Sequence, residues 1–276
     1  MTDRYAVIGN PVAHSKSPEI HSMFARQSGQ DIDYARLLAP VGGFKTTVES
    51  FIAGGGRGAS VTVPFKLEAF DLAHQVSQRS KDARAANYLK FDGGRIVADN
   101  TDGFGLVRDI VTNLGFGIAA KRVLLMGAGG AVQGVLVPLL EQGPAILALA
   151  NRTPDKALRL AETFRHHAAA AHTVLSGQGY SDLAGRHFDL VINATSSSLS
   201  DELPPLPASV FAADALAYEL MYGRGLTPFL AFAREQGVRR LADGLGMLVE
   251  QAAESFRLWR GVRPSTGPVI EALRKA

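Results

Sequence analysis

The chain has 276 residues, of which 46% are hydrophobic and 20% charged, and its formal net charge is +3 at pH 7. This length is enough for two domains with buried cores, and the composition is typical of a globular protein. The small positive excess is spread along the chain without runs of lysine and arginine, so a nucleic-acid partner is not expected. Cysteine is absent, which excludes disulfides, thiolate metal sites and a cysteine nucleophile.

The first hundred residues alternate predicted strands and helices. We expect Ser17 to cap the first helix, Pro18 to take its first position and Gly29 to end it. Gly93-Gly94 predicts a tight turn between two strands of a hairpin. The expected strands are residues 5–9, 33–39, 58–63, 86–91 and 94–99, and the expected helices are residues 17–29 and 43–55.

The rest of the chain continues this alternation and ends in helices. Such a pattern predicts a parallel sheet with helices on both faces. A surface loop is expected at 196–207, and apolar residues recur at helical spacing from Leu245 to Trp259. The expected order is a helix at 103–113, a strand, glycine turn and helix within 122–143, a strand in 145–153, a helix from Pro154, strands in 172–175 and 188–196, and a last helix at 267–276.

The stretch SVTVPFK, residues 60–66, looks like an apolar strand that ends at Pro64 and carries Lys66 at its tip. A lysine at a strand end is usually a solvated surface group. In the loop before the first helix, Ser15 and Ser17 suit a carboxylate or a polyol, although a simple helix cap explains Ser17 equally well. Asp102 is likewise either a functional carboxylate or a cap.

A glycine-rich turn follows an apolar strand and precedes a helix. Glycines there allow backbone N–H groups to approach a pyrophosphate at a helix N-terminus, so the turn predicts dinucleotide binding. The sixth position of the motif is Val132 rather than glycine, and a tight turn without a ligand is the alternative. The turn consists of Gly127, Ala128, Gly129, Gly130 and Ala131.

The next strand ends in Asn151, Arg152 and Thr153, where an NAD-binding chain usually carries an acidic residue. Arginine can bind a 2′-phosphate through two hydrogen bonds, and Lys156 adds a second cation. Pro154 suits the first position of a helix whose N-terminus would favour the same anion. We therefore expect NADP rather than NAD, with three ordinary solvated residues as the alternative. The seven histidines, including His14 and His21, show no spacing typical of a metal site.

Characteristic motifs follow one another along the chain: GNPVAHSKSPEIH, SVTVPFK, AANYL, ADNTDGFG, GAGGA, NRT, INATS and ADGLGMLVEQAAESFRLWRG. Together, these motifs resemble the shikimate dehydrogenase family over nearly the whole chain. The resemblance implies an α/β protein of two domains: an N-terminal substrate domain completed by C-terminal helices (1–102 and 239–276) and a Rossmann-like NADP-binding domain (103–238). It also implies NADPH-linked reduction of 3-dehydroshikimate to shikimate in aromatic amino-acid (chorismate) biosynthesis.

The resemblance also implies roles for individual residues. Lys66 would be the proton-transfer residue, with Asp102 beside it. The substrate contacts would be Ser15, Ser17, Thr62, Lys66, Asn87, Asp102, Tyr222 and Gln251. The cofactor contacts would be Gly127 to Ala131, Asn151, Arg152, Thr153, Lys156, Leu220 and Gly244. Two positions depart from the pattern of several members, because Gln78 stands where some have an acidic residue and Lys156 where several have arginine.

Two other functions fit the same sequence less well. One is a quinate/shikimate dehydrogenase that prefers NAD, against which the basic NRTPDK stretch argues. The other is a ligand sensor without activity, which would not need Lys66. No apolar run approaches the ~20 residues needed to cross a bilayer, and the N-terminus lacks a signal-peptide core. We expect a cytoplasmic monomer or homodimer that binds a small-molecule substrate, with no membrane partner and no metal.

Overall fold

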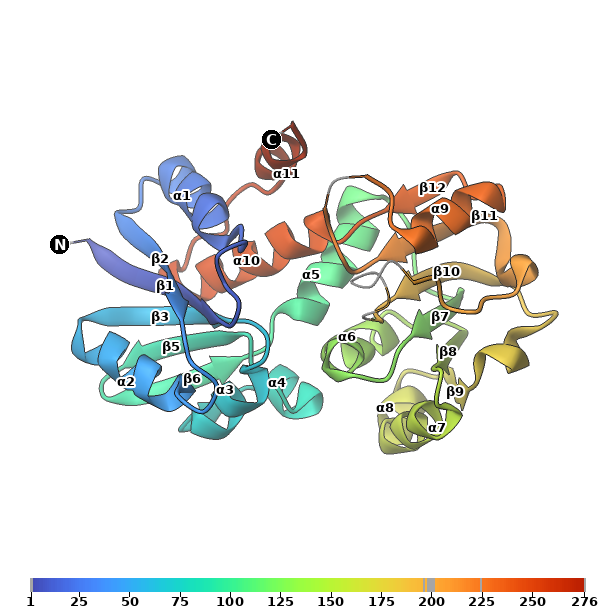
Figure 1. The fold of residues 1–276 in the computed structure, drawn as a ribbon, viewed down its shortest axis with the longest axis horizontal. Coiled ribbons are helices and arrows are strands. Elements are labelled where there is room, and N and C mark those ends of the chain that lie inside the picture. The colour runs from blue at the N-terminus through green and yellow to red at the C-terminus, as the bar shows by residue number, and fades with distance from the viewer. Residues whose placement is uncertain (1, 196, 198–201, 224, 276) are drawn as a thin grey trace. The chain divides into compact units, whose positions relative to one another are not determined.

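The computed structural model describes residues 2–195, 197, 202–223 and 225–275. It divides into two compact units, Met1–Gly105 with Leu248–Ala276, and Leu106–Met247 (Figure 1). Each unit has its own sheet of six strands. Among the described residues, no helix is long and apolar enough to cross a membrane.

The first unit is built on a mixed sheet with strand order β2-β1-β3-β5-β6-β4. β1 pairs in parallel with β2 and β3, while β5 runs antiparallel to β3 and β6. Gly93 and Gly94 join β5 to β6 with φ values of 54° and 76°, a left-handed conformation that favours glycine, as the hairpin prediction requires. The strands are β1 Asp3–Gly9, β2 Ile32–Leu38, β3 Gly56–Val61, β4 Gln75–Val76, β5 Tyr88–Asp92 and β6 Arg95–Asp99.

Helices surround this sheet, and the C-terminal part of the chain returns to it. Phe256 of α10 is fully buried and shares a core with Ile20 and Phe24 of α1. This packing explains why the apolar stripe of the C-terminal helix has helical spacing. The helices are α1 Ser17–Ser28, α2 Phe44–Ala53, α3 Lys66–Leu72, α4 Gln78–Ala83 and α11 Gly267–Lys275. Two more helices, α5 Asp102–Arg108 and α10 Leu245–Arg260, each have residues in both units.

Two local predictions in this unit were wrong. The residue that caps α1 is Lys16, and Ser17 is already helical, although Gly29 ends the helix with φ 63° as expected. Lys66 does not extend β3 but is the first residue of α3, because the strand stops at Val61 and a short turn precedes the helix. Pro64 lies in that turn, where its missing N–H weakens no sheet ladder.

The second unit contains an all-parallel sheet with order β12-β11-β10-β7-β8-β9. This is the strand order of a Rossmann fold, in which ligands bind at the carboxyl ends of the strands. The strands are β7 Arg122–Met126, β8 Ile146–Ala150, β9 Val174–Gln178, β10 Phe188–Asn193, β11 Phe211–Glu219 and β12 Arg240–Ala242. The helices are α6 Gly130–Leu140, α7 Pro154–Thr163, α8 Arg165–Ala170 and α9 Pro228–Glu235, with a π-helical turn at Asp109–Asn113 and 3₁₀ turns at Tyr180–Leu183 and Ala208–Val210.

The end of this unit differs from the sequence expectation. No strand was predicted between residues 197 and 238, yet β11 is the longest strand of the sheet. β12 then pairs with β11, so the second unit extends to Met247 rather than ending near 238. Of the loop expected at 196–207, residues 196 and 198–201 lie outside the described residues, and Glu202–Pro207 is irregular.

Candidate active site

Lys66 and Asp102 form an ion pair at one edge of the first sheet. Nζ of Lys66 lies 2.5 Å from Oδ2 of Asp102, and their side chains are 31% and 15% exposed. Lys66 begins α3 after β3, and Asp102 begins α5 after β6. β3 and β6 flank β5 and both run antiparallel to it, so their carboxyl ends lie at the same end of the sheet, where the segments that follow them lead to Lys66 and Asp102.

Asn87 joins this pair from the strand between them. It precedes β5, is 3% exposed, and donates from Nδ2 to Oδ1 of Asp102 at 2.7 Å and to Oε1 of Gln251 at 3.2 Å. Its Oδ1 accepts the backbone N–H of Thr101 at 2.8 Å. Because the amide is bonded at both ends, Asn87 holds one fixed orientation beside the carboxylate.

Gln251 reaches the site from α10, and its Nε2 also donates to the carbonyl of Leu248 at 2.8 Å. Lys66, Asn87, Asp102 and Gln251 therefore form one connected polar cluster in the first unit, although they lie far apart in the chain. The cluster presents an ammonium, a carboxylate and two amides, groups that suit a polar substrate better than an apolar one.

Ser15 and Ser17 lie together before and within the first turn of α1. Their hydroxyls are 3.2 Å apart, and Ser15 Oγ accepts the N–H of Ser17 at 3.3 Å. Arg36 fixes this turn by donating to the carbonyl of Ser15 at 3.0 and 2.6 Å.

Thr62 follows β3 and lies against β1. A Cβ on Gly9 would lie 2.4 Å from Cγ2 of Thr62, so only glycine allows the two segments to approach this closely.

Tyr34 and Ser60 were missed by the sequence analysis: the buried hydroxyl of Tyr34 donates to Ser60 Oγ at 2.7 Å. Burial raises the pKa of Tyr34 well above its usual range, so this hydroxyl stays protonated. Ser60 lies in the SVTVPFK stretch, which is the only signal that could have pointed to it.

The glycine turn of the second unit lines a cavity of about 490 Å³. A Cβ on Gly127 (φ 114°) would approach Ala194 O to 3.0 Å, whereas a Cβ on Gly129 or Gly130 would meet no atom within 4 Å. The protein's own packing therefore does not require glycine at 129 and 130, and a close-approaching ligand would explain it. The lining also includes Asn151, Arg152, Tyr180, Thr195 and residues 202–205.

Arg152 lies at the rim of this cavity as an exposed cation. Among the described residues Arg152 has no ion-pair partner. Burial raises the pKa of Tyr180 to about 12, and the nearby Arg152 cation partly opposes this shift. Asn151 donates to the carbonyl of Thr153 at 3.0 Å, and Thr153 is the N-terminal cap residue of α7. Lys156 is exposed in the first turn of α7 but does not line the cavity.

Leu220 and Gly244 meet at the carboxyl end of β11, outside the lining of that cavity. A Cβ on Gly244 would lie 2.0 Å from the carbonyl oxygen of Leu220, so this contact requires glycine. Glu219, which the sequence analysis missed, is fully buried next to Leu220 and accepts hydrogen bonds from Asn193 (2.8 Å) and from the N–H of Met221 (3.1 Å).

Tyr222 belongs to the second unit, in the segment between β11 and α9. Within the described part of the chain, no group of three or more histidine, aspartate or glutamate side chains is arranged to hold a metal ion.

Known proteins and family models are similar to this chain, and relatives match it over its whole length or nearly so. Family models match residues 7–89 (Shikimate dehydrogenase substrate binding domain), 109–200 (Shikimate / quinate 5-dehydrogenase) and 244–274 (Shikimate 5'-dehydrogenase C-terminal domain). A relative from Nitrosospira multiformis, named Shikimate dehydrogenase (NADP(+)), is 60% identical over 276 residues, which cover 100% of this chain and 98% of that protein.

Solved structures agree with this match. An Ael1 enzyme from Pseudomonas putida has a TM-score of 0.93 and 55% identity, covering 99% of this chain and 98% of its own. Shikimate 5-dehydrogenase from Thermus thermophilus, in complex with NADP(H) and shikimate, has a TM-score of 0.87 and 30% identity, covering 99% of each chain.

Proposed function

The chain belongs to the shikimate dehydrogenase family, and from this premise we propose that Lys66 and Asp102 are the proton-transfer pair of an NADP-dependent enzyme that interconverts 3-dehydroshikimate and shikimate. The observation that carries the proposal is the Lys66–Asp102 contact of 2.5 Å, with Asn87 and Gln251 beside it. A partly exposed ammonium held by a carboxylate has the chemistry of a general acid–base group.

The reaction defines what Lys66 must do. NADPH, when bound, supplies the hydride that reduces the ketone carbon. The ketone oxygen then gains negative charge and needs a proton, and the Lys66 ammonium stabilises that charge and donates a proton from Nζ. In the oxidation of shikimate, the neutral amine of Lys66 accepts the hydroxyl proton. Asp102 positions the amine and accepts a hydrogen bond from a ring hydroxyl.

The other polar groups account for recognition of the substrate. We propose that the hydroxyls of Ser15 and Ser17 bind the carboxylate, and that Thr62, Asn87, Tyr222 and Gln251 contact the ring hydroxyls. Such a site discriminates strongly, because an analogue that lacks a hydroxyl leaves a buried polar group of the protein unpaired. Ser60, presented by Tyr34, extends the same set of hydroxyls.

The second unit has the features needed to hold NADP. Gly129 and Gly130 have open space where a side chain would be, which leaves their backbone N–H groups accessible to a pyrophosphate. We propose that Arg152, with Lys156 and the N-terminal end of α7, binds the 2′-phosphate. Asn151 and Thr153 shape that turn, and Leu220 and Gly244 contact the nicotinamide end.

Spectrophotometry tests the function directly. Purified protein mixed with NADPH and 3-dehydroshikimate should oxidise NADPH, and NADP with shikimate should run the reverse reaction. Parallel assays replace NADP by NAD, and shikimate by quinate. If both replacements give a much lower kcat/KM than NADP with shikimate, the NAD-preferring quinate/shikimate dehydrogenase is excluded. A protein that binds shikimate without any turnover would be a sensor, and the proposal would be wrong. We also propose a cytoplasmic location and a monomeric or homodimeric state, the latter to be measured by light scattering.

A further inference from the structure

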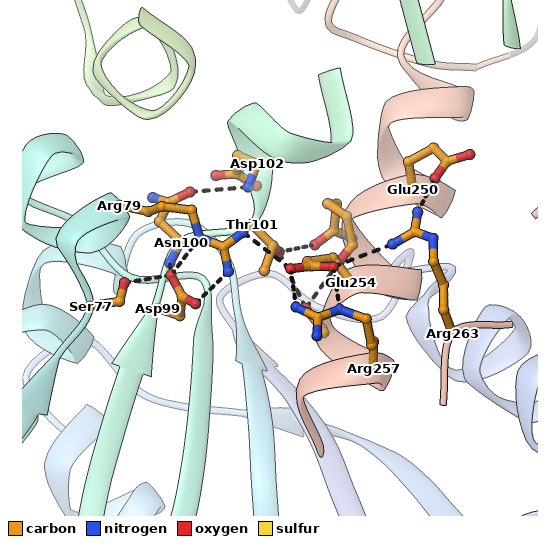
Figure 2. Close-up of polar contacts among 12 residues, drawn as sticks. Ser77, Arg79, Asp99, Asn100, Thr101, Asp102, Glu250, Glu254, Arg257 and Arg263 are labelled. Carbon is orange, nitrogen blue, oxygen red and sulfur yellow. Dashed lines mark hydrogen bonds and ion pairs between the residues drawn. The ribbon is translucent and has the colours of Figure 1, made fainter. Parts of the chain in front are cut away.

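A network of charged and polar side chains lies next to the segment that leads to Asp102 in the first unit (Figure 2). We call it the Arg79 network. It connects the strand before Asp102 to the helix that carries Gln251. Its members are Ser77, Arg79, Asp99, Glu250, Glu254, Arg257 and Arg263.

Asp99 is the end of the network nearest the site. It is the last residue of β6 and 7% exposed, and its carboxylate accepts from Arg79 through Nε at 3.1 Å and Nη2 at 2.5 Å. The hydroxyl of Ser77 donates to the same carboxylate. A buried carboxylate held by a two-point arginine contact has little freedom to rotate.

Asp99 in turn fixes the backbone that presents Asp102. Its Oδ1 accepts the N–H of Asn100 at 2.7 Å, and Oδ1 of Asn100 accepts the N–H of Asp102 at 3.0 Å. Asn100 is also anchored through Nδ2 to the carbonyl of Ala85 at 3.1 Å. The N–H of Asp102 begins α5 and has no partner within that helix, so its direction depends on this side-chain contact.

Arg79 extends the network to α10. Its Nη1 donates at 3.1 Å to Oε1 of Glu254, a residue that is 2% exposed. Glu254 lies one turn after Gln251 on α10, so the two side chains share a face of the helix. Arg79 also lies over the ring of Phe104, with 5.9 Å from Cζ to the centroid. A single guanidinium thus links the segment that presents Asp102 to the helix that presents Gln251.

We propose that Arg79 is a positioning residue for the reaction: by bridging Asp99 and Glu254 it sets the orientation of Asp102 and therefore of the Lys66 ammonium. This inference rests on the proposed roles of Lys66 and Asp102. The alternative is that Arg79 only neutralises buried carboxylates. Arg257 offers a matched comparison, because it pairs with Glu254 at 2.8 and 2.9 Å but interacts with Asp99 only through longer-range charge attraction, without a hydrogen bond or an ion pair.

The test compares Arg79→Met, Arg79→Lys and Arg257→Met by steady-state kinetics with shikimate and NADP. Small displacements of a catalytic group reduce rates by up to about a hundredfold, so we expect Arg79→Met to lower kcat by roughly 10- to 100-fold and Arg79→Lys by roughly 3- to 10-fold. Lysine keeps the positive charge between the buried carboxylates, but its compact ammonium cannot reproduce the two-point contact with Asp99 together with the bond to Glu254. The KM for NADP should not change, and Arg257→Met should keep kcat within about twofold of the parent.

The solvent deuterium isotope effect on kcat separates mispositioning from loss of stability, because a less stable variant with an intact site would show the same isotope effect as the parent. It should be larger in both Arg79 variants than in the parent, because a misplaced Lys66 makes proton transfer a slower step. Equal losses of kcat in Arg79→Met and Arg257→Met, or an unchanged isotope effect, would overturn the inference. If Arg79→Met does not fold, Arg79→Lys decides instead: its kcat is compared with that of Arg257→Met, and its isotope effect with that of the parent. Should Lys66→Ala keep the parent kcat, the proposed proton-transfer role of Lys66 would be wrong, a result that is distinct from any outcome of the Arg79 variants.

Discussion

Nζ of Lys66 lies 2.5 Å from Oδ2 of Asp102, although the two residues are 36 positions apart and begin different helices. The other carboxylate oxygen of Asp102 accepts from Asn87 at 2.7 Å, so each oxygen has its own donor. This division keeps the carboxylate from rotating and directs the ammonium to one place. A proton donor that is held in one orientation gives the pair its catalytic value.

Lys66→Ala tests the proton-transfer role. We expect kcat to fall by roughly 10²–10⁴, the usual range for a positioned acid–base group, while the KM for shikimate changes much less. Lys45→Ala is a suitable control, since that side chain is 71% exposed and its Nζ lies 3.9 Å from Oε1 of Glu49. A variant with normal kcat and a raised KM would mean that Lys66 serves binding alone.

Arg152→Ala tests the proposed contact with the 2′-phosphate. A hydrogen bond to a charged group is worth about 1.5–3 kcal/mol, so the KM for NADP should rise roughly tenfold to a hundredfold, whereas the KM for NAD should stay nearly constant. Arg159→Ala, an exposed arginine further along α7, should affect neither KM. Equal effects on both cofactors would place Arg152 against some other part of the nucleotide.

Gly244→Ala tests the contact between β11 and the segment before α10. The added Cβ would lie 2.0 Å from the carbonyl oxygen of Leu220, so the backbone must shift. Overpacking of this kind costs roughly 1–3 kcal/mol, and we expect a lower urea midpoint and a higher KM for NADP. Gly223→Ala is the control, because a Cβ there meets no atom within 4 Å. Parent-like behaviour of Gly244→Ala would show that Leu220 moves freely.

The Arg122–Asp189 pair should make the stability of the second unit depend on pH. Hydrogen bonds from Arg122, at 2.9 and 3.1 Å, hold the pKa of Asp189 below its ordinary value of 3.8. A carboxyl group whose pKa is lower in the folded than in the unfolded protein stabilises the fold at pH values above its unfolded-state pKa. This stabilisation is lost as the pH falls through the folded-state pKa.

Asp189→Asn should therefore lower stability at neutral pH by about 1–2 kcal/mol, with a smaller difference from the parent at about pH 3. Urea unfolding at the two pH values measures this. A difference that stays constant with pH would mean that the charge of Asp189 contributes nothing and that only its shape matters.

Local patterns in the sequence determined much of this protein. Gly93-Gly94 predicted a hairpin because two consecutive left-handed residues suit glycine, and the turn at Gly127–Ala131 predicted a strand–turn–helix because glycine permits its geometry. The chain length suggested two domains, and the family resemblance implied their bounds. Together with the alternation of strands and helices, the local patterns predicted an α/β protein with a dinucleotide-binding unit. They depend on residues within a few positions of one another, so a linear reading can find them.

Other features were decided only by tertiary structure. Lys66 begins a helix rather than ending a strand, and β12 extends the second unit because it pairs with the unpredicted β11. Asn87 meets Gln251 across 164 positions, and Arg79 meets Glu254 across 175. Such contacts depend on which sheet edge and which helix face come together. The free energy that selects them comes from burying whole surfaces, which no short stretch of sequence encodes by itself.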